Sequence, residues 1–483
     1  MLQRLGEGIL AHGEKKGIST WLILANVSVG TFMSTLDGSI ANVALPTIAT
    51  EMRMPLHVVQ WVLTAYLLTI SATLPIVGKL SDLYGRTRVY QMGFLIFVIG
   101  SAGCGLSQSL ELLIVSRILQ AIGASCLMSN SQAIIAHTFA RGGRGQALGI
   151  IGTIVSLGSL TGPGIGGVLV GNLGWPSIFW INIPIGILGF IAGMFILPKD
   201  KKEPVKEPFD YLGSSLFITG MITLLYMLSN AQEWGWSSPL VLSGIGGSLF
   251  ILILFYVHEK RSAYPMLDFS LYRIRTFAFG NMAAFLSFIS LFFVGVMMPF
   301  YMQNVLGFSP EVTGYTMMAQ PLTMAIIAPL SGWLSDKIGP SFLTTAGLLM
   351  NALGYFLLNT LTIHESPWMV ALHLAFFGLG SGMFQSPNNA SVMGAVPKPR
   401  LGTAGGLNAL VRNVGMVTGI TLSVSLFSSR FQQITGHLGA FPTHGQTNAE
   451  AMMDSLHLVF WVALGICLAG AFISSRRFGK GTF

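Results

Sequence analysis

Long apolar segments of about 20 residues recur along this chain of 483 residues, and they constrain its fold more than any other feature. Each segment is long enough to cross a bilayer as a helix. Hydrophobic residues make up 52% of the chain and charged residues only 9%, whereas about 25% is usual for a soluble domain. The segments are continuous and do not alternate with a period of two, so the sequence predicts an all-α integral membrane protein and not a barrel.

Fourteen spans are predicted, and an even number places both termini on one side of the membrane. The first span is too long for the core of a signal peptide and no small-residue cleavage site follows it, so we expect it to be retained. The longest outer loop is expected at residues 428–455. The predicted spans cover residues 20–45, 57–79, 89–107, 110–136, 146–170, 178–197, 211–230, 239–257, 277–300, 312–334, 341–361, 367–390, 402–427 and 455–475.

The basic residues gather on one side of these spans. Of the 26 Lys and Arg residues, Arg53 and Arg430 lie on the opposite side, Arg117 and Arg412 lie within spans, and all others lie on the side of the termini. Positively charged loops stay in the cytoplasm. The sequence therefore predicts a multi-pass membrane protein with both termini cytoplasmic. The net charge of +8 is then a topology signal, and nucleic acid is not an expected partner.

A short motif occurs twice and divides the chain. Residues 78–85 read G-K-L-S-D-L-Y-G after the second span, and residues 332–339 read G-W-L-S-D-K-I-G after the tenth. The copies lie about 50 residues further apart than six helices of this density require. We therefore expect an N-terminal six-helix bundle at 1–197, a linker with an inserted two-helix hairpin at 198–276, and a C-terminal six-helix bundle at 277–483.

The two copies of the motif are candidates for ionic latches between neighbouring helices. Glycine permits a tight turn, and an aspartate accepts hydrogen bonds from a helix N-terminus or from arginine. A charged turn without a further role is the alternative, and the repetition favours the latch. The candidate latch residues are Gly78, Asp82, Gly85, Arg86, Asp336 and Gly339.

One carboxylate lies deep inside an apolar segment. Asp37 is about 16 residues into the first span, which is about 24 Å along a helix. A carboxylate at such a depth costs about 3 kcal/mol, so it is seldom kept without a partner or a task. A functional role in binding a proton or a substrate charge is favoured, and a structural carboxylate that fixes one helix against another is the alternative.

Two arginines also lie within spans. Arg117 in the fourth span lies about 10 Å below the outer surface, at a level similar to that of Asp37, so we expect the two to pair. Such a pair is either part of proton coupling or a permanent structural salt bridge. Arg412 lies near mid-membrane in the thirteenth span, where it either pairs with a carbonyl or faces a cavity.

The fifth span is unusually rich in glycine. Residues 158–167 read G-S-L-T-G-P-G-I-G-G. A formal match to the dinucleotide fingerprint is rejected, because no strand precedes it and a proline interrupts it. Small residues let helices approach closely and proline bends a helix, so close packing is the physical interpretation. The residues of interest are Gly158, Gly162, Pro163, Gly166 and Gly167.

These motifs together resemble the major facilitator superfamily. Residues 78–88 resemble its signature loop, residues 113–123 its proton-coupling motif, and residues 158–167 match the pattern G-x-x-x-G-P-x-x-G-G of its exporters. Residues 36–46, L-D-G-S-I-A-N-V-A-L-P, resemble the first-span motif of its fourteen-span drug:proton antiporters, and residues 412–415 resemble that branch's R-x-x-G.

The resemblance implies a major facilitator fold and a proton-coupled secondary exporter of the multidrug-efflux type. It implies Asp37, Arg117 and Arg412 as proton-coupling or substrate residues, and the glycines of the fifth span as the antiporter motif. The expected substrates are amphipathic, cationic drugs or dyes, with the proton gradient as energy source and no cofactor. A dedicated exporter or flippase of a lipid, a glycolipid or a single natural antibiotic or metabolite is the alternative.

Several other classes of protein lack support in the sequence. No G-x-x-x-x-G-K-S/T phosphate loop is present, so ATP is not the energy source by that route. His258-Glu259 and His364-Glu365 lack the second His of a zinc motif, and the three cysteines show no metal spacing. We therefore expect a monomeric transporter in the lipid bilayer, not an enzyme, with protons and small molecules as partners. No metal site and no adaptor protein are indicated.

Overall fold

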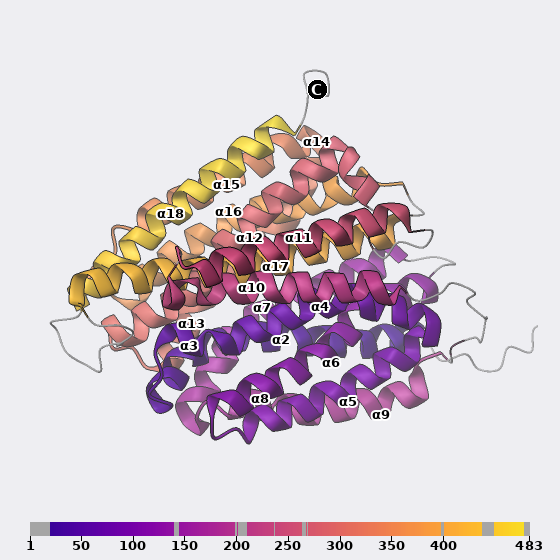
Figure 1. Cartoon of the computed structure of the whole chain (residues 1–483), viewed down its shortest axis with the longest axis horizontal. Coiled ribbons are helices and arrows are strands. Elements are labelled where there is room, and N and C mark those ends of the chain that lie inside the picture. The colour runs from indigo at the N-terminus through magenta and orange to yellow at the C-terminus, as the bar shows by residue number, and fades with distance from the viewer. Residues whose placement is uncertain are drawn as a thin grey trace, which may run out of the picture.

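The computed structural model describes residues 20–139, 144–198, 200, 210–235, 237–262, 267, 269–397, 400–436 and 449–477. These residues form helices, and no strand occurs among them. The long helices run roughly along one direction of the molecule (Figure 1). In the described part of the chain, 11 helices are both long and apolar enough to cross a membrane. The predicted all-α membrane fold is thereby confirmed.

Helical passages occur at all the positions where the sequence predicts spans, and three of them are interrupted by a short break. The first six passages are α2 (Thr20–Glu51), α3 (Leu56–Val59) with α4 (Trp61–Tyr84), α5 (Arg86–Gly105), α6 (Leu110–Thr138), α7 (Arg144–Leu173), and α8 (Ser177–Trp180) with α9 (Asn182–Ile196). Two further passages follow, α10 (Tyr211–Trp234) and α11 (Pro239–Arg261).

The last six passages follow a short 3₁₀ helix, η1 (Phe269–Arg273). The first of them, α12, ends in a short π-helix, η2 (Tyr301–Val305). The helices are α12 (Arg275–Phe300), α13 (Pro310–Met317) with α14 (Ala319–Ile338), α15 (Pro340–Leu358), α16 (Pro367–Gly394), α17 (Leu401–Thr435) and α18 (Ala449–Arg476).

The first six and the last six passages pack in the same pattern. In each set the first helix packs on the fifth, and the second and third pack on the fourth: α2 on α7, α4 and α5 on α6, α12 on α17, α14 and α15 on α16. The fifth helix of each set also packs on the second helix of the other, as α7 on α13 and α17 on α4. We call the two sets the N bundle and the C bundle. Their exact boundaries in the sequence stay predictions.

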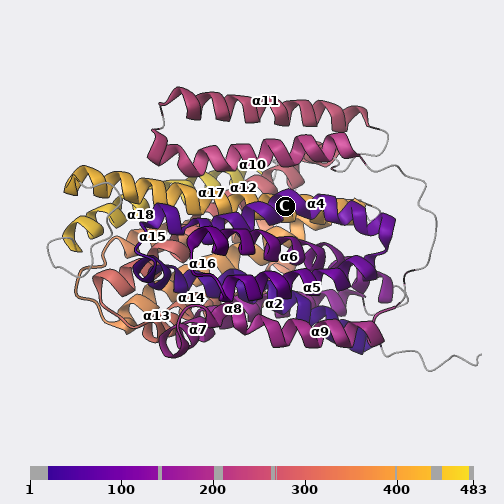
Figure 2. The same ribbon diagram turned by 60° about the horizontal axis from the view of Figure 1, so that its bottom comes forward.

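The α10–α11 hairpin lies at the edge of the molecule. α10 packs against α4 and α17, one helix from each bundle, and α11 packs against α10 on the outer side (Figure 2). Only 17% of the apolar stretch of α11 is buried within the protein, so most of this helix faces outward. The hairpin therefore packs outside the two bundles, and the inserted segment at 198–276 stays a prediction.

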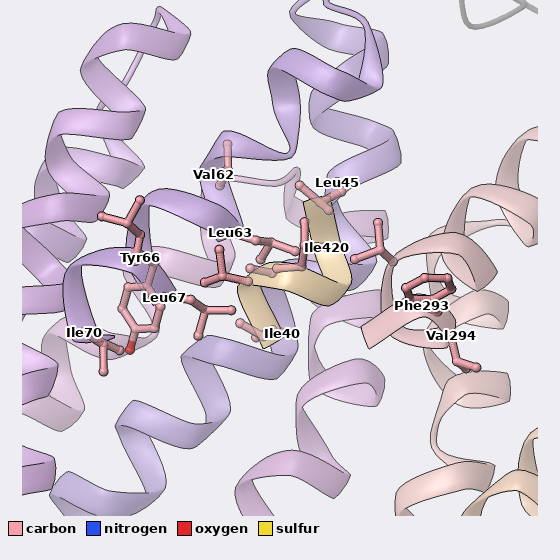
Figure 3. Close-up of a cluster of buried hydrophobic side chains, with 14 of the residues drawn as sticks. Ile40, Leu45, Val62, Leu63, Tyr66, Leu67, Ile70, Phe293, Val294 and Ile420 are labelled. Carbon is pink, nitrogen blue, oxygen red and sulfur yellow. The ribbon is translucent and has the colours of Figure 1, made fainter. Parts of the chain in front are cut away.

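A single apolar cluster joins the two bundles. We call the end where α2 begins and α18 finishes the terminal end, and the opposite one the far end. Ile40 and Leu45 of α2 meet Leu63 of α4, Phe293 of α12 and Ile420 of α17 (Figure 3). These side chains lie in the half of the molecule nearer the far end, and all are buried. The apolar contact between the bundles is therefore made there.

The helices next to the longest predicted loop extend further than the sequence predicts. α17 continues to Thr435 and α18 begins at Ala449, so the loop is much shorter than the predicted 428–455. The added turns contain polar residues, so a rule based on apolar runs assigns them to the loop. Outside the apolar layer, backbone hydrogen bonds still stabilise a helix whose side chains face water. The predicted boundary at this loop is therefore wrong, whereas the two spans themselves are present.

Arg477 fixes the terminal end of the C bundle. It is only 2% exposed, and its Nη1 donates to Oδ1 of Asn388 on α16 at 2.7 Å. The Asn388 amide in turn donates to the carbonyl of Gly280 on α12 at 3.3 Å. One guanidinium therefore holds α18 and α16 together, and through Asn388 it reaches α12.

Arg477→Met is expected to destabilise the protein by about 1.5–3 kcal/mol, because a buried hydrogen bond from a charged group is lost and the Asn388 oxygen is left unpaired. The neighbouring Arg476→Met is the matched control, since Arg476 is exposed. Thermal unfolding in detergent measures both variants. Equal melting temperatures for the two would contradict the assignment.

Candidate proton-coupling site

The Asp37 carboxylate lies at the centre of a buried polar network in the N bundle. Oδ2 accepts a hydrogen bond from Nη1 of Arg117 at 2.6 Å. Oδ1 accepts from Nε2 of Gln120 at 2.8 Å and from Nδ2 of Asn182 at 2.9 Å. The side chains of Asp37 and Arg117 have no exposed surface. Three donors from α6 and α9 therefore stabilise a negative charge on α2.

Arg117 is itself held from several sides. Its Nε donates to the Val62 carbonyl of α4 at 2.9 Å, and its Nη1 also reaches Oε1 of Gln120 at 2.7 Å. The guanidinium lies 4.1 Å from the ring centroid of Tyr66 and 5.5 Å from that of Phe179. Its Nη2 is buried and has no hydrogen-bond partner in the described part of the chain. The pair that the sequence predicts is thus present, and it links helices that cross the N bundle.

Two neutral amides complete the site and were not among the residues selected from the sequence. Gln120 joins Asp37 to Ser101 of α5, whose hydroxyl accepts from the same amide at 2.8 Å. Asn182 opens α9 after a break at Ile181, and the break directs its side chain toward α2. A signal for both exists in retrospect: Gln120 follows Arg117 by three residues on one helix face, and Asn182 is a lone amide in an apolar run.

One face of α7 packs tightly on α2 beside Asp37. The Gly158 carbonyl accepts from the Ser39 hydroxyl at 3.1 Å. A methyl group at Gly162 would collide with the Ser39 side chain, and one at Gly166 would lie 2.7 Å from Ile40. Glycine at these positions, four residues apart, lets the two helices approach closely. The segment that carries Asp37 is therefore in direct contact with the glycine face of α7.

Another face of α7 packs on the C bundle at the far end. A methyl group at Gly167 would collide with the Pro310 carbonyl and lie 3.0 Å from Gly314, both on α13. Gly314 in turn lies against the Pro163 carbonyl. The glycine-rich segment thus has two packing faces, one for α2 within its own bundle and one for α13 across the boundary. This second face is the α7–α13 seam.

Hydrogen bonds add to this seam at the far end. The Gln303 amide donates to the Val43 carbonyl at 3.0 Å, and the Thr47 hydroxyl lies 3.4 Å from Oε1 of the same side chain. Gln303 belongs to the π-helical turn η2 of the C bundle, and its partners belong to α2. The seam, these bonds and the apolar cluster together close the far end between the bundles.

The predicted latch loops lie at the terminal end. Gly85 and Gly339 have φ of 101° and 81° at the turns that follow α4 and α14, a region where only glycine is unstrained. Asp200 accepts from the backbone N–H groups of Thr87 and Arg88, at 3.0 and 2.9 Å, and so caps α5. Asp200 was not selected from the sequence.

The other latch candidates are only partly described. Gly78 lies in the last two turns of α4, where its carbonyl accepts from the Ser81 hydroxyl at 2.6 Å, and Arg86 opens α5. The side chains of Asp82 and Asp336 lie outside the described part of the structure. The latch therefore stays a prediction.

Arg412 stands apart from the Asp37 network. It lies on α17 in the C bundle, is half-buried, and forms no ion pair or hydrogen bond with another described residue. In the described part of the chain no group of three or more His, Cys, Asp or Glu side chains is arranged to hold a metal ion. The charged site residues thus separate into a neutralised pair in the N bundle and a single cation in the C bundle.

Comparisons with known proteins decide the family. The family described as Major Facilitator Superfamily matches residues 27–270, 209–420 and 280–480. The chain belongs to the major facilitator superfamily. It is 36% identical over 94% of its length to the riboflavin transporter RibZ of Clostridioides difficile, and covers 96% of that protein. It is 32% identical over 86% of its length to the multidrug transporter protein MdtP of Bacillus subtilis, of which it covers 77%.

The fold is likewise that of known major facilitator proteins. A solved structure of the peptide transporter POT in complex with sulfate superposes with a TM-score of 0.67, covering 94% of each chain at 17% identity. Such an identity shows the fold alone. The family match and the two transporter relatives, together with this fold, show that the chain is a multi-span membrane transporter and not an enzyme.

Proposed function

We propose that this transporter is a proton-coupled antiporter that exports amphipathic small molecules across the cytoplasmic membrane of a bacterium. The observation that carries the proposal is the Asp37 carboxylate, fully buried in a membrane-spanning helix and held by Arg117, Gln120 and Asn182. A buried ionisable group of this kind marks a proton path more often than a structural contact. The terminal end, where α2 begins, α18 finishes and most basic residues of the described loops lie, is proposed to be the cytoplasmic one.

The proposed cycle begins from the conformation seen here. The far end is closed by the α7–α13 seam, and in the proposed cycle the substrate enters between the bundles from the cytoplasmic end. In this state Asp37 is ionised and paired with Arg117. When the bundles rock to open outward, the pair separates, Asp37 takes a proton from outside, and the substrate leaves. Return to the present conformation restores the pair and releases the proton to the cytoplasm.

The contacts of α7 support a mechanical link between these two events. Ser39 is two residues from Asp37 and touches Gly158 and Gly162 on one face of α7, while Gly167 on another face touches Gly314 of the C bundle. If a change in the charge of Asp37 moves α2, α7 moves with it. The packing of α7 on α13, which closes the far end, then changes as well. The proton gradient supplies the energy, and no cofactor takes part. The latch loops, with Asp82 and Asp336, are proposed to stabilise the terminal end of each bundle when it closes.

The charge of the substrate is a separate question. The prediction of cationic drugs or dyes assumes that a substrate cation reaches the Asp37 carboxylate. In this conformation Arg117 neutralises that carboxylate, and neither side chain has exposed surface. The proposed function therefore specifies amphipathic molecules without specifying their charge.

A dedicated exporter of one metabolite is the second candidate function. It is favoured by the similarity to RibZ, a protein named as a riboflavin transporter, which extends over 94% of the chain. A panel of unrelated compounds separates the candidates, since multidrug export gives resistance to several and dedicated export to one.

Purified protein in liposomes tests the proposed function. We would load the liposomes with buffer, impose a pH gradient, and follow fluorescein and rhodamine 123, two xanthene dyes of opposite charge. We expect at least one dye to accumulate against its gradient, and the accumulation to collapse when nigericin removes the pH gradient. Dye accumulation that is unchanged after nigericin removes the pH gradient would contradict proton coupling.

A further inference from the structure

Two hydrogen-bond donors without acceptors lie near mid-membrane in the C bundle. Arg412 of α17 forms no ion pair or hydrogen bond with another described residue. The amide nitrogen of Gln385 on α16 is buried and has no hydrogen-bond partner among the residues that the structure describes. A buried donor without an acceptor costs about 1–3 kcal/mol, which applies to the Gln385 amide. An ionisable group inside a membrane span usually pairs with another group or lines a path for a substrate or an ion, so the half-buried Arg412 marks a candidate ligand site.

The face of α17 that carries Arg412 points into the protein and not toward lipid. Gly415 and Gly419, at i+3 and i+7, share that face. A methyl group at Gly415 would lie 2.9 Å from the Phe285 carbonyl of α12, and one at Gly419 would lie 2.5 Å from the Ile289 carbonyl. The glycine face therefore packs closely on α12. Arg412 lies on the same face of α17, one turn nearer the terminal end.

A hydrogen bond between α17 and α16 fixes the position of Gln385 relative to Arg412. Nδ2 of Asn408 on α17 donates to Oδ1 of Asn389 on α16 at 3.0 Å. The two helices run in opposite directions, so one turn toward the far end leads from Asn408 to Arg412 and from Asn389 to Gln385. Arg412 and Gln385 thus lie at one level on facing helices, about 14–17 Å from the helix ends.

The charges near mid-membrane determine what these donors recognise. In the described spans the charged side chains at that depth are Asp37, Arg117 and Arg412. The first two form an ion pair without exposed surface, so their charges cancel. Arg412 then leaves a single positive charge in a region of low dielectric, which attracts anions and repels cations. Guanidinium and amide N–H groups together match the oxygens of a carboxylate or a phenolate.

Aromatic side chains of α12 lie against the side of α17 on which Arg412 is placed. Phe285 and Phe288 are half-buried and contact the glycine face of α17 that Arg412 shares. An aromatic surface next to a guanidinium suits a flat molecule that carries an acidic group at one edge. The aromatic side chains and the positive charge of Arg412 therefore favour the same class of molecule, a flat one with an acidic group.

We propose that Arg412 and Gln385 form the substrate subsite for an acidic oxygen group, so that the exported molecules are flat, amphipathic organic anions. The assignment rests on the proposed export function and names its substrate class. It also determines the net charge that crosses the membrane in each cycle. Exchange of one monoanion for one proton moves two positive charges inward per cycle, so a membrane potential alone, negative inside, drives export. Exchange of one monovalent cation for one proton is electroneutral.

Dye binding to the purified protein in detergent tests the subsite without requiring transport. Fluorescein and rhodamine 123 share a xanthene ring and differ in charge. We expect the wild type to bind fluorescein about tenfold more tightly than rhodamine 123, and Arg412→Gln to remove about tenfold of the fluorescein affinity without weakening the binding of rhodamine 123. Gln385→Leu is expected to weaken fluorescein binding several-fold, and Arg412→Lys to retain part of it.

Arg430→Gln is the matched control, because it removes one arginine from the same helix. Arg430 is exposed and pairs with Asp454 at 2.7 Å, away from the subsite. The control should bind both dyes as the wild type does. A preference of the wild type for rhodamine 123, absence of saturable fluorescein binding, or equal affinities in Arg412→Gln and Arg430→Gln would each overturn the assignment.

Failure of the subsite and failure of the proposed function give different results. If fluorescein binds through Arg412 but neither dye is driven by a pH gradient in liposomes, the subsite stands and antiport fails. If rhodamine 123 is exported against its gradient and fluorescein does not bind, antiport stands and the assignment of organic anions is overturned.

Discussion

Asp37→Asn is expected to abolish proton-driven dye accumulation in liposomes, a loss of at least about a hundredfold in the coupled rate. Asparagine has nearly the same shape and keeps an oxygen that accepts from Gln120 and Asn182, but it neither carries a charge nor exchanges a proton. The dye that the wild type accumulates, fluorescein or rhodamine 123, is the probe. Downhill movement of the same dye is expected to persist, because the path between the bundles is unchanged.

Two controls separate loss of coupling from loss of folding. Breaking one partner of a buried ion pair costs about 3–5 kcal/mol, so the double variant Asp37→Asn with Arg117→Gln removes both charges together. Asp454→Asn removes an exposed carboxylate that pairs with Arg430 and should behave as the wild type does. If Asp37→Asn keeps full proton-driven accumulation, the ion pair is structural and the coupling group lies elsewhere.

The second large effect is expected at the far end. Gly167→Leu places a branched side chain where the backbone of Pro310 and Gly314 leaves no room, and backbone atoms do not move aside cheaply. The α7–α13 seam should then fail to close, which removes the conformation described here from the cycle. We expect proton-driven accumulation to fall at least about tenfold, with the far end open.

Cysteine labelling reports the state of the far end directly. The native Cys104, Cys126 and Cys467 are all buried, so they give a low background. Thr47→Cys places a thiol beside Gln303, and its rate of reaction with a membrane-impermeant maleimide should rise at least about tenfold in the Gly167→Leu background. Gly246→Leu is the control, because nothing lies within 4 Å of a methyl group there. Equal labelling rates in the two backgrounds would contradict the role of the seam.

The fold was predictable because the bilayer imposes a simple rule on the sequence. Each passage needs about 20 apolar residues, and basic loops mark one side. Those rules place all the helices, including α10 and α11. They fail where a helix leaves the apolar layer, as at Thr435 and Ala449, because hydropathy then no longer distinguishes a helix from a loop.

The site was predictable only in part, for a related reason. A charge inside a span is conspicuous, so Asp37 and Arg117 were selected, and their similar depth correctly predicts that they pair. Gln120 and Asn182 are neutral amides, which hydropathy tolerates, and their importance appears only when the carboxylate between them is seen. The glycines of α7 were recognised as packing residues, but a sequence does not show that Gly158 faces α2 while Gly167 faces the other bundle.

The central claim is that substrate binding and proton release are linked through Asp37. The most direct test is to add the transported dye to purified protein in weakly buffered solution, at a series of pH values, and to measure the protons released. The account predicts about one proton per dye bound by the wild type and none by Asp37→Asn, because linkage between the two ligands is reciprocal. Equal proton release by both proteins would contradict it.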